Sequence, residues 1–493
     1  MISSKEVAIA STQEPWEYPS KHPFLPDEPY PELRDRIAGG QERNITYRLL
    51  RQLMFNLEMD VQHFSTHDWN PFGEVIKPGQ KVLIKPNLVR HLHLGGGDYR
   101  AVVTHGSLVR CVLDYAALAL KGGGEIVVGD APIQSADFSK ILERTGLREV
   151  CDDVSKTWQL PVRLQDFRLR SVQLDDNHRI IQANGLEGDP KGYVAVDLGK
   201  RSLLAPLGKQ SEKFRVTNYD CKEMSKHHNE TTNEYLIPRT VLDADVVINL
   251  PKLKTHRKVG VTAALKNIVG INGYKDWLPH HRCGSMVEGG DEYLHPSILK
   301  RLQSALGERM GGDTYSSRNA AQRFAGRILT RLIRHMATDP FFEGSWYGND
   351  TLWRTVLDLN RLLVYANREG EMTEVPQRKC LNIVDAIMAG EGEGPMEPDP
   401  RPLGILVGGI NPGAVDAVLA TMVGFDYRKI PLIAKGFEIR DWPIINFDPA
   451  KIEVHSQDDR WKSLRVGETS NKFNFKPPSG WLGHAESLQN TKQ

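Results

Sequence analysis

The residues best suited to chemistry lie in one stretch, residues 243–270, which reads DADVVINLPKLKTHRKVGVTAALKNIVG. Residues 245–250 are a short apolar run rich in β-branched residues, which is typical of a buried strand. Pro251 cannot donate a hydrogen bond to a neighbouring strand, so we expect regular pairing to end there. The next residues include five cations: Lys252, Lys254, His256, Arg257 and Lys258.

This arrangement predicts an anion site. Open α/β sheets bind ligands just beyond the carboxyl ends of their strands. Lysines held close together and partly out of water lower one another's pKa, which suits an anion clamp, a nucleophile or a base. We therefore expect Lys252, Lys254 and Thr255 to bind an anionic substrate and His256 to move protons. A solvated surface turn is the ordinary alternative for lysines in a loop.

Lys266 is harder to explain as a surface residue. It lies within the segment VTAALKNIVG, where apolar residues flank it on both sides, although its chain could still reach water by snorkelling. We expect Lys266 to be a base or a point of covalent attachment, with Asn267 beside it as a substrate contact.

Further candidates follow the strands of a βαβ unit. The strand expected at residues 81–84 is followed by Lys85 and Asn87, predicted to bind substrate. His105 precedes the amphipathic helix expected at residues 108–121 and is a candidate for proton transfer. A second strand ends at Asp130.

Carboxylates near the C-terminal part of the chain complement these cations. Residues 381–389 read as a strand, followed by an acidic, glycine-rich loop that carries Glu391. Asp385, Glu391 and Asp130 could together hold a divalent metal, or could simply pair with the lysines. Asn411 lies in the turn between the next strand and helix and is a further candidate for substrate binding.

The composition indicates a globular protein and argues against several other classes of protein. The chain has 493 residues, 40% hydrophobic and 25% charged, which is ordinary globular composition. A net charge of +1 argues against nucleic acid as a partner. The sequence contains neither an apolar run of membrane-spanning length nor a signal peptide, so we expect a cytoplasmic protein with no membrane partner. Its five cysteines form no C-x₂-C pair, which argues against an iron–sulfur cluster.

The predicted fold is α/β, with a mostly parallel sheet, helices on both faces, and two lobes with a cleft between them. The expected parts are a lead-in (1–77), a first α/β lobe (78–272) with a mixed insertion at about 133–240, a mainly helical insertion or lid (273–370), a second α/β segment (371–440) and a C-terminal extension (441–493).

Several segments together resemble the domain-of-unknown-function 362 family. They are KVLIKPNLV, VTHGSLVRCVLDYA, GGEIVVGDAP, ADVVINLPKLKTH, GVTAALKNIVGI, LNIVDAIMAGEGEGP and GGINPGAVDAVLA. The resemblance implies no particular activity. Some members of that family carry ferredoxin-type cysteine motifs, which this chain lacks, so iron–sulfur chemistry is not carried over.

A shorter stretch is similar to the lactate racemase family, in which a lysine attaches a nickel-pincer nucleotide and histidines bind the metal or move protons. The resemblance implies His256 and Lys266 as the counterparts, with His105 as a further candidate.

From these observations we expect the protein to be an enzyme that acts on a small carboxylated or phosphorylated molecule, by proton transfer or redox chemistry. The alternative is a non-catalytic protein that binds a nucleotide or another cofactor. A third reading has the charged residues as structural ion pairs. The cofactor stays open between a divalent metal, a nucleotide-type group and none, and a homo-oligomer is left open.

Overall fold

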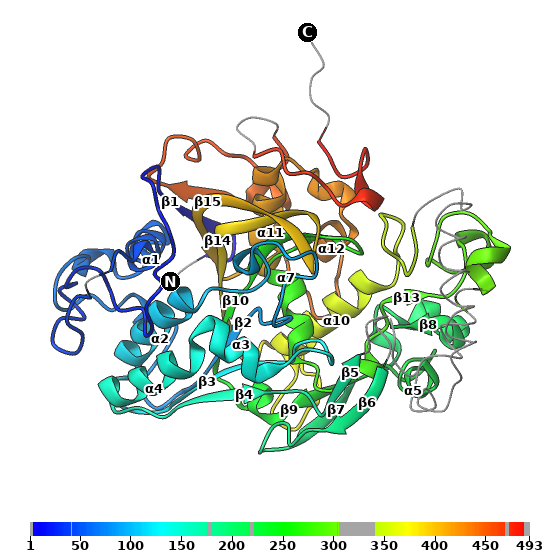
Figure 1. Cartoon of the computed structure of the whole chain (residues 1–493), viewed down its shortest axis with the longest axis horizontal. Helices are drawn as coiled ribbons and strands as arrows, with labels where there is room; N and C mark the ends of the chain where they lie inside the picture. Colours follow the sequence, from blue (N-terminus) through cyan, green and yellow to red (C-terminus); the bar gives the residue numbers. More distant parts are fainter. Residues whose placement is uncertain are drawn as a thin grey trace, which may run out of the picture.

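The computed structural model describes residues 3–40, 42–174, 180–216, 221–302, 304, 341–468 and 473–487. Its centre is a ten-stranded sheet (Figure 1). Eight strands follow one another across it: β16 (Glu453–Ser456), β1 (Glu6–Ser11), β15 (Glu397–Gly409), β14 (Lys379–Glu393), β10 (Val246–Leu250), β2 (Lys81–Pro86), β3 (Glu125–Asp130) and β4 (Val162–Asp166).

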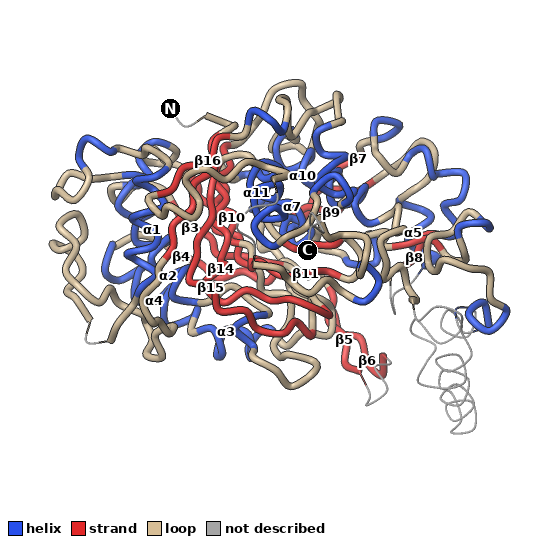
Figure 2. Tube along the Cα trace, turned by 90° about the horizontal axis from the view of Figure 1, so that it is seen from above, coloured by secondary structure: helices blue, strands red, loops and turns tan. Residues whose placement is uncertain are grey.

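The sheet is mostly parallel, which confirms the predicted α/β class. Strands β14, β10, β2, β3 and β4 are parallel neighbours, whereas β15 runs antiparallel to both β14 and β1. Figure 2 shows the sheet between two layers of helices. One layer contains α1 (Ile45–Asn56), α2 (Gly106–Leu120) and α4 (Leu147–Trp158), and the other α7 (Ala264–Asn267), α10 (Leu352–Tyr365) and α11 (Pro412–Val423).

Side-chain alternation explains why both faces are covered. In β2, Val82 and Ile84 pack into the apolar core on the α1–α2–α4 side, while Leu83 between them packs into the core on the α10–α11 side. Successive side chains of a strand point to opposite faces, so a continuous apolar run needs a cover on each. The βαβ unit predicted from the sequence is present as β2, α2 and β3.

The segments expected to form two lobes share this one sheet. β10 comes from the first segment and β14 from the second, and they pair in parallel from Val246↔Lys379 to Asn249↔Asn382. The lead-in and the C-terminal extension also contribute strands, because β1 pairs with both β15 and β16. The structure therefore does not confirm a division into two lobes.

Two segments expected to be loops are strands. The chain resumes pairing directly after Pro251 as β11 (Lys252–His256), which lies parallel to β14 and antiparallel to β12 (Gly260–Thr262). The acidic glycine-rich segment belongs to β14, because β15 pairs with it as far as Glu393↔Glu397, past a register shift between Ala386 and Met388. Glycines weaken a strand when it stands alone. Here the long antiparallel pairing with β15 keeps the glycine-containing segment in β14.

The part of the chain that follows is only partly described. Within the insertion expected to be mainly helical (273–370), residues 303 and 305–340 lie outside the described residues. The described part of this insertion contains α10, and the Asn349 side chain accepts from the N–H groups of Thr351 and Leu352 at its start. In the described ranges, no helix has both the length and the apolar character needed to cross a membrane.

Candidate functional site

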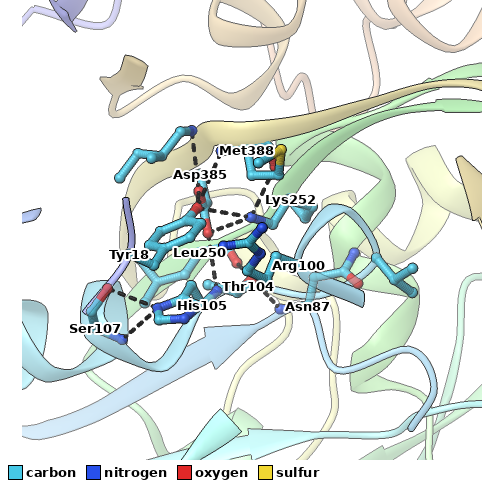
Figure 3. Close-up of polar contacts among 12 residues, drawn as sticks. Tyr18, Asn87, Arg100, Thr104, His105, Ser107, Leu250, Lys252, Asp385 and Met388 are labelled. Carbon is cyan, nitrogen blue, oxygen red and sulfur yellow. Dashed lines mark hydrogen bonds and ion pairs between the residues drawn. The ribbon is translucent and has the colours of Figure 1, made fainter. Parts of the chain in front are cut away.

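β11 brings Lys252 into a buried cluster with Tyr18 and Asp385 (Figure 3). The Lys252 ammonium lies 2.6 Å from Asp385 Oδ2, 3.2 Å from the Tyr18 hydroxyl and 3.1 Å from the Met388 carbonyl. Tyr18 in turn donates to Asp385 Oδ1 at 2.7 Å. All three donors of the ammonium are therefore used within the protein.

His105 adjoins this cluster, with its ring stacked on Tyr18 at a centroid distance of 3.8 Å. Its Nδ1 accepts from the backbone N–H of Ser107 at 3.2 Å, so His105 is the N-cap of α2. Burial and the nearby charge of Lys252 hold the pKa of His105 well below its usual value. The ring is therefore neutral at pH 7, and a capping role accounts for its position.

Lys85, at the end of β2, is also fully engaged. Its ammonium lies 2.7 Å from Asp130 Oδ1, 2.9 Å from the Pro86 carbonyl and 3.2 Å from Asn267 Oδ1. The Asn267 amide also donates to the Lys85 carbonyl and to Asn249 Oδ1, which links β2, α7 and β10 through side chains. Lys85 and Asn267 thus form part of a buried polar network that joins strands to α7.

The cations that remain form a second group, which we call the cationic cluster: Lys254, His256, Lys258, Lys266, Lys275 and His280. These charges act on one another. The charges of Lys266, His280, Lys258 and Lys254, together with burial as the larger cause, hold the pKa of His256 well below its usual value. The pKa of Lys254 is also held well below its usual value, mainly by burial and then by the charges of Lys252 and Lys266.

Lys266 is the residue of this cluster with an uncommitted amine. Within the described residues it makes no hydrogen bond and no ion pair, and the residue is half-buried. Burial, followed by the charges of Lys85 and Lys258, lowers its pKa to about 8. Both protonation states are therefore populated near neutral pH.

Two buried lysines of the cluster keep spare donors. Lys254 donates to the Val102 carbonyl and, at 3.5 Å, to Asn87 Oδ1. Lys275 donates at 3.1 Å to the Val269 carbonyl, and burial lowers its pKa to about 7 against the opposing charge of Asp130. Because an ammonium has three donors, both lysines can still bond a ligand.

The remaining predicted residues have partners of their own. The Thr255 hydroxyl donates to the Gly392 carbonyl. The Asn87 amide oxygen accepts the long hydrogen bond from the Lys254 ammonium. Asn411 caps α11 by accepting from the N–H groups of Gly413 and Ala414, and it donates to the Ile444 carbonyl. Both ends of that amide are thus occupied within the fold.

The three carboxylates proposed for a metal each face a different cation. Asp130 pairs with Lys85, Asp385 with Lys252, and Glu391 with Arg401 at 2.9 Å. Among the described residues, the side chains grouped closely enough to hold a metal are those of Glu6, Glu453 and His455, at the far edge of the sheet. Their ligand atoms all lie within 4.8 Å of one another. The geometry gives a metal at Asp130, Asp385 and Glu391 no support.

A separate cavity of about 640 Å³ opens beyond the carboxyl ends of β3 and β4. Its lining includes His91, Asp137, Lys140, Asp166 and Arg168. The Arg168 charge reaches the cationic cluster, because it contributes to the lowered pKa of Lys275. None of the residues predicted to bind substrate lines this cavity.

Sequence reasoning missed three of the relevant residues. Tyr18 comes from a lead-in that carried no motif, and only the fold brings it to Lys252. Lys275 and His280 follow α7 within the segment NGYKDWLPHHRC, and neither was among the predicted site residues. The signal that could have identified Lys275 and His280 was a lysine between two aromatic residues, followed by two adjacent histidines, shortly after Lys266.

Comparison with known proteins matches this chain to a family of unknown function and to a thylakoid-associated protein. The family described as "Domain of unknown function (DUF362)" matches residues 82–178 and 179–421. A "thylakoid-associated protein" of Synechocystis sp. is 24% identical over 362 residues, which cover 73% of this chain and 68% of the relative.

A crystal structure of a Thermotoga maritima protein also matches, with 10% identity and a TM-score of 0.30. The match covers 67% of this chain and 51% of that one, so the aligned part spans about half of the Thermotoga protein. Likeness at this level carries no argument about fold or activity.

Proposed function

The chain belongs to the domain-of-unknown-function 362 family, and from the geometry of its cationic cluster we propose that it binds a small carboxylated or phosphorylated molecule there and acts on it by proton transfer. One observation carries the proposal: the uncommitted amine of Lys266, with a pKa of about 8, stands among other cations. Grouped cations that lower one another's pKa are costly for a folded protein, and an anion would relieve that cost.

The division among the lysines supports this site over the Lys252 cluster. Lys85 and Lys252 each face a carboxylate and two further acceptors, so they have no donor to offer. Lys254, Lys266 and Lys275 keep donors, and Lys266 is only half-buried. A ligand could therefore reach the cluster from solvent and meet ammonium groups that have no anionic partner among the described residues.

Lys266 suits proton transfer as well as binding. A group transfers protons best when its pKa lies near the working pH, and Lys266 meets this condition. A non-catalytic carrier would need only the charge of the lysine and not its ability to exchange a proton. Substitution by arginine separates the two roles, because arginine keeps the charge and does not lose its proton.

The first experiment measures binding of sulfate, an inorganic dianion, by calorimetry at pH 8 in buffers of different ionisation enthalpy. We expect sulfate to bind with uptake of protons, because it favours the charged forms of Lys266 and Lys275. Lys266→Met should weaken binding by about tenfold or more, the loss of one charged hydrogen bond. Lys435→Met, which removes an exposed lysine paired with Glu438, is the matched control. Absence of binding would remove the proposal.

The second experiment tests catalysis without knowledge of the substrate. Pools of small carboxylated and phosphorylated compounds are incubated with the protein in heavy water, and deuterium at carbon is detected by mass spectrometry. We expect one class of compound to exchange with the wild type. Lys266→Arg should bind sulfate and exchange far more slowly, whereas equal exchange by that variant would show that Lys266 serves only as an anchor.

Mass spectrometry of the denatured protein distinguishes a free amine from an attachment point. A residue that exchanges protons must carry no modification, so we expect Lys266 to be recovered unmodified. A stable adduct mapped to Lys266 would contradict the proposed role and favour a covalently held group.

A further inference from the structure

Two histidines of the cationic cluster have ring nitrogens whose roles are fixed by the backbone. In His256, Nδ1 accepts a hydrogen bond from the backbone N–H of Lys258 at 3.0 Å. An imidazole nitrogen that accepts carries no proton, so the neutral ring of His256 holds its proton on Nε2.

His280 has the opposite arrangement. Its Nδ1 lies 2.6 Å from the carbonyl oxygen of Leu278, and a carbonyl can only accept. Nδ1 therefore carries the proton, and Nε2 of the neutral ring is left with its lone pair. Within the described residues, neither histidine uses Nε2 in a hydrogen bond.

The surroundings keep both rings neutral. His256 is buried, and His280 is half-buried. Burial is the largest cause of the lowered pKa of His280. The charges of Lys258 after β11, Lys266 on α7 and Lys275 on the segment that follows lower this pKa further, while the Leu278 carbonyl acts in the opposite direction. The ring of His280 is thus an uncharged acceptor beside cations, which is the state required of a base at pH 7.

Building on the proposed function, we propose that His280 Nε2 is the base that removes a proton from the substrate, while the Nε2–H of His256 and the Lys266 ammonium bind the oxygen that becomes negative. The substrate class that fits is an acid with a C–H bond next to its carbonyl or carboxylate group. Donors would then face the developing charge, and a lone pair would face the proton.

The step balances without an external oxidant or reductant. His280 Nε2 takes the proton, and the electron pair of the broken C–H bond moves into a new carbon–carbon double bond. The carbonyl electron pair moves onto oxygen, which takes a proton from the Lys266 ammonium. In the reverse step carbon receives a proton that has exchanged with solvent, so heavy water labels the compound.

The tautomers are tested first, because they need no substrate. Long-range proton–nitrogen correlation spectra of the full chain, labelled with ¹⁵N-histidine, are recorded at pH 7.5. His280→Asn and His256→Asn identify the two signals by their loss. We expect His280 with its proton on Nδ1 and His256 with its proton on Nε2. A charged His280, or a proton on its Nε2, overturns the assignment.

The base role is tested with the same His280→Asn variant, whose amide can still donate to the Leu278 carbonyl. We expect sulfate affinity within about twofold of the wild type, loss of deuterium exchange by at least a hundredfold, and partial rescue of exchange by added imidazole. A purely structural histidine would not respond to imidazole.

Failure of the two proposals can be told apart. If wild-type protein binds sulfate and exchanges deuterium while His280→Asn does so equally well, His280 is not the base and the proposed function stands. If wild-type protein binds no sulfate, the proposed function fails whatever the tautomers are. If it binds sulfate but labels no acid of the stated class, the base assignment is overturned.

Discussion

At the scale of single residues, the acceptors around each ammonium decide what a lysine can do. Lys252 has three acceptors and is completely buried, while Lys266 has none among the described residues and is half-buried. The two lie 14 positions apart, and both were expected to belong to one site. This difference is the reason for proposing a scaffold role for Lys252 and a ligand role for Lys266.

Removal of Lys252 should therefore be costly. In Lys252→Met, Asp385 stays buried without its cation, although Tyr18 and the backbone N–H groups of His105 and Ile387 still donate to it. Breaking a buried ion pair from one side costs about 3–5 kcal/mol of unfolding free energy, which urea denaturation would measure. The double change Lys252→Met with Asp385→Leu should recover part of that loss. A single variant as stable as the wild type would contradict the scaffold role.

Much of the residue chemistry was visible in the sequence, and its grouping was not. Residue types and their position after strands predicted lysines and histidines near the carboxyl edge of the sheet. Which lysine meets which carboxylate depends on contacts between distant segments, such as Tyr18 with Asp385, 367 positions apart. No local pattern encodes such a pair.

At the scale of elements, the turn that follows α7 lies close to the ends of β2 and β3 at a glycine. A Cβ on Gly270 would lie 1.9 Å from Asp130 Oδ1 and 2.5 Å from Lys85 Nζ, both of which belong to the buried ion pair. Asp416 on α11 fixes the other end of α7 by accepting from the N–H groups of Ala264 and Leu265. The position of Lys266, between these two anchors, depends on both.

We expect Gly270→Ala to displace the Lys85–Asp130 pair, with a loss of about 3–5 kcal/mol in unfolding free energy and weaker sulfate binding. Gly185→Ala is the matched control, because a Cβ there would meet no atom within 4 Å. Denaturation and calorimetry on both variants check the expectation. Equal behaviour of the two would show that the ion pair tolerates the extra methyl group.

The elements of the sheet were predictable where apolar runs were continuous, as in β2, β3 and β10. Sequence reasoning failed at β11, because KLKTH is polar in composition and follows a proline. Its five residues are all buried and lie beside β14. Tertiary pairing overrode local propensity there, and only the fold could reveal it.

At the scale of the whole molecule, the cationic cluster should shape the dependence of stability on pH. The pKa of Lys275 is lowered from 10.5 to about 7 and that of Lys266 to about 8. Between these values and 10.5 the unfolded chain binds more protons than the folded one, so stability rises with pH across that range. One titrating lysine contributes a slope of at most about 1.4 kcal/mol per pH unit.

We expect urea denaturation of the wild type in chloride buffers to show this rise between about pH 7 and pH 10, on top of the contribution of other groups. Lys275→Met should have a smaller slope, and the exposed control Lys435→Met should have the slope of the wild type. Sulfate, which stays doubly charged throughout, should stabilise the wild type most at about pH 7 and least at pH 10, because it favours the protonated lysines. If sulfate stabilises the protein equally at both ends of the range, the lysines do not titrate as the cluster requires, and the anion is bound elsewhere.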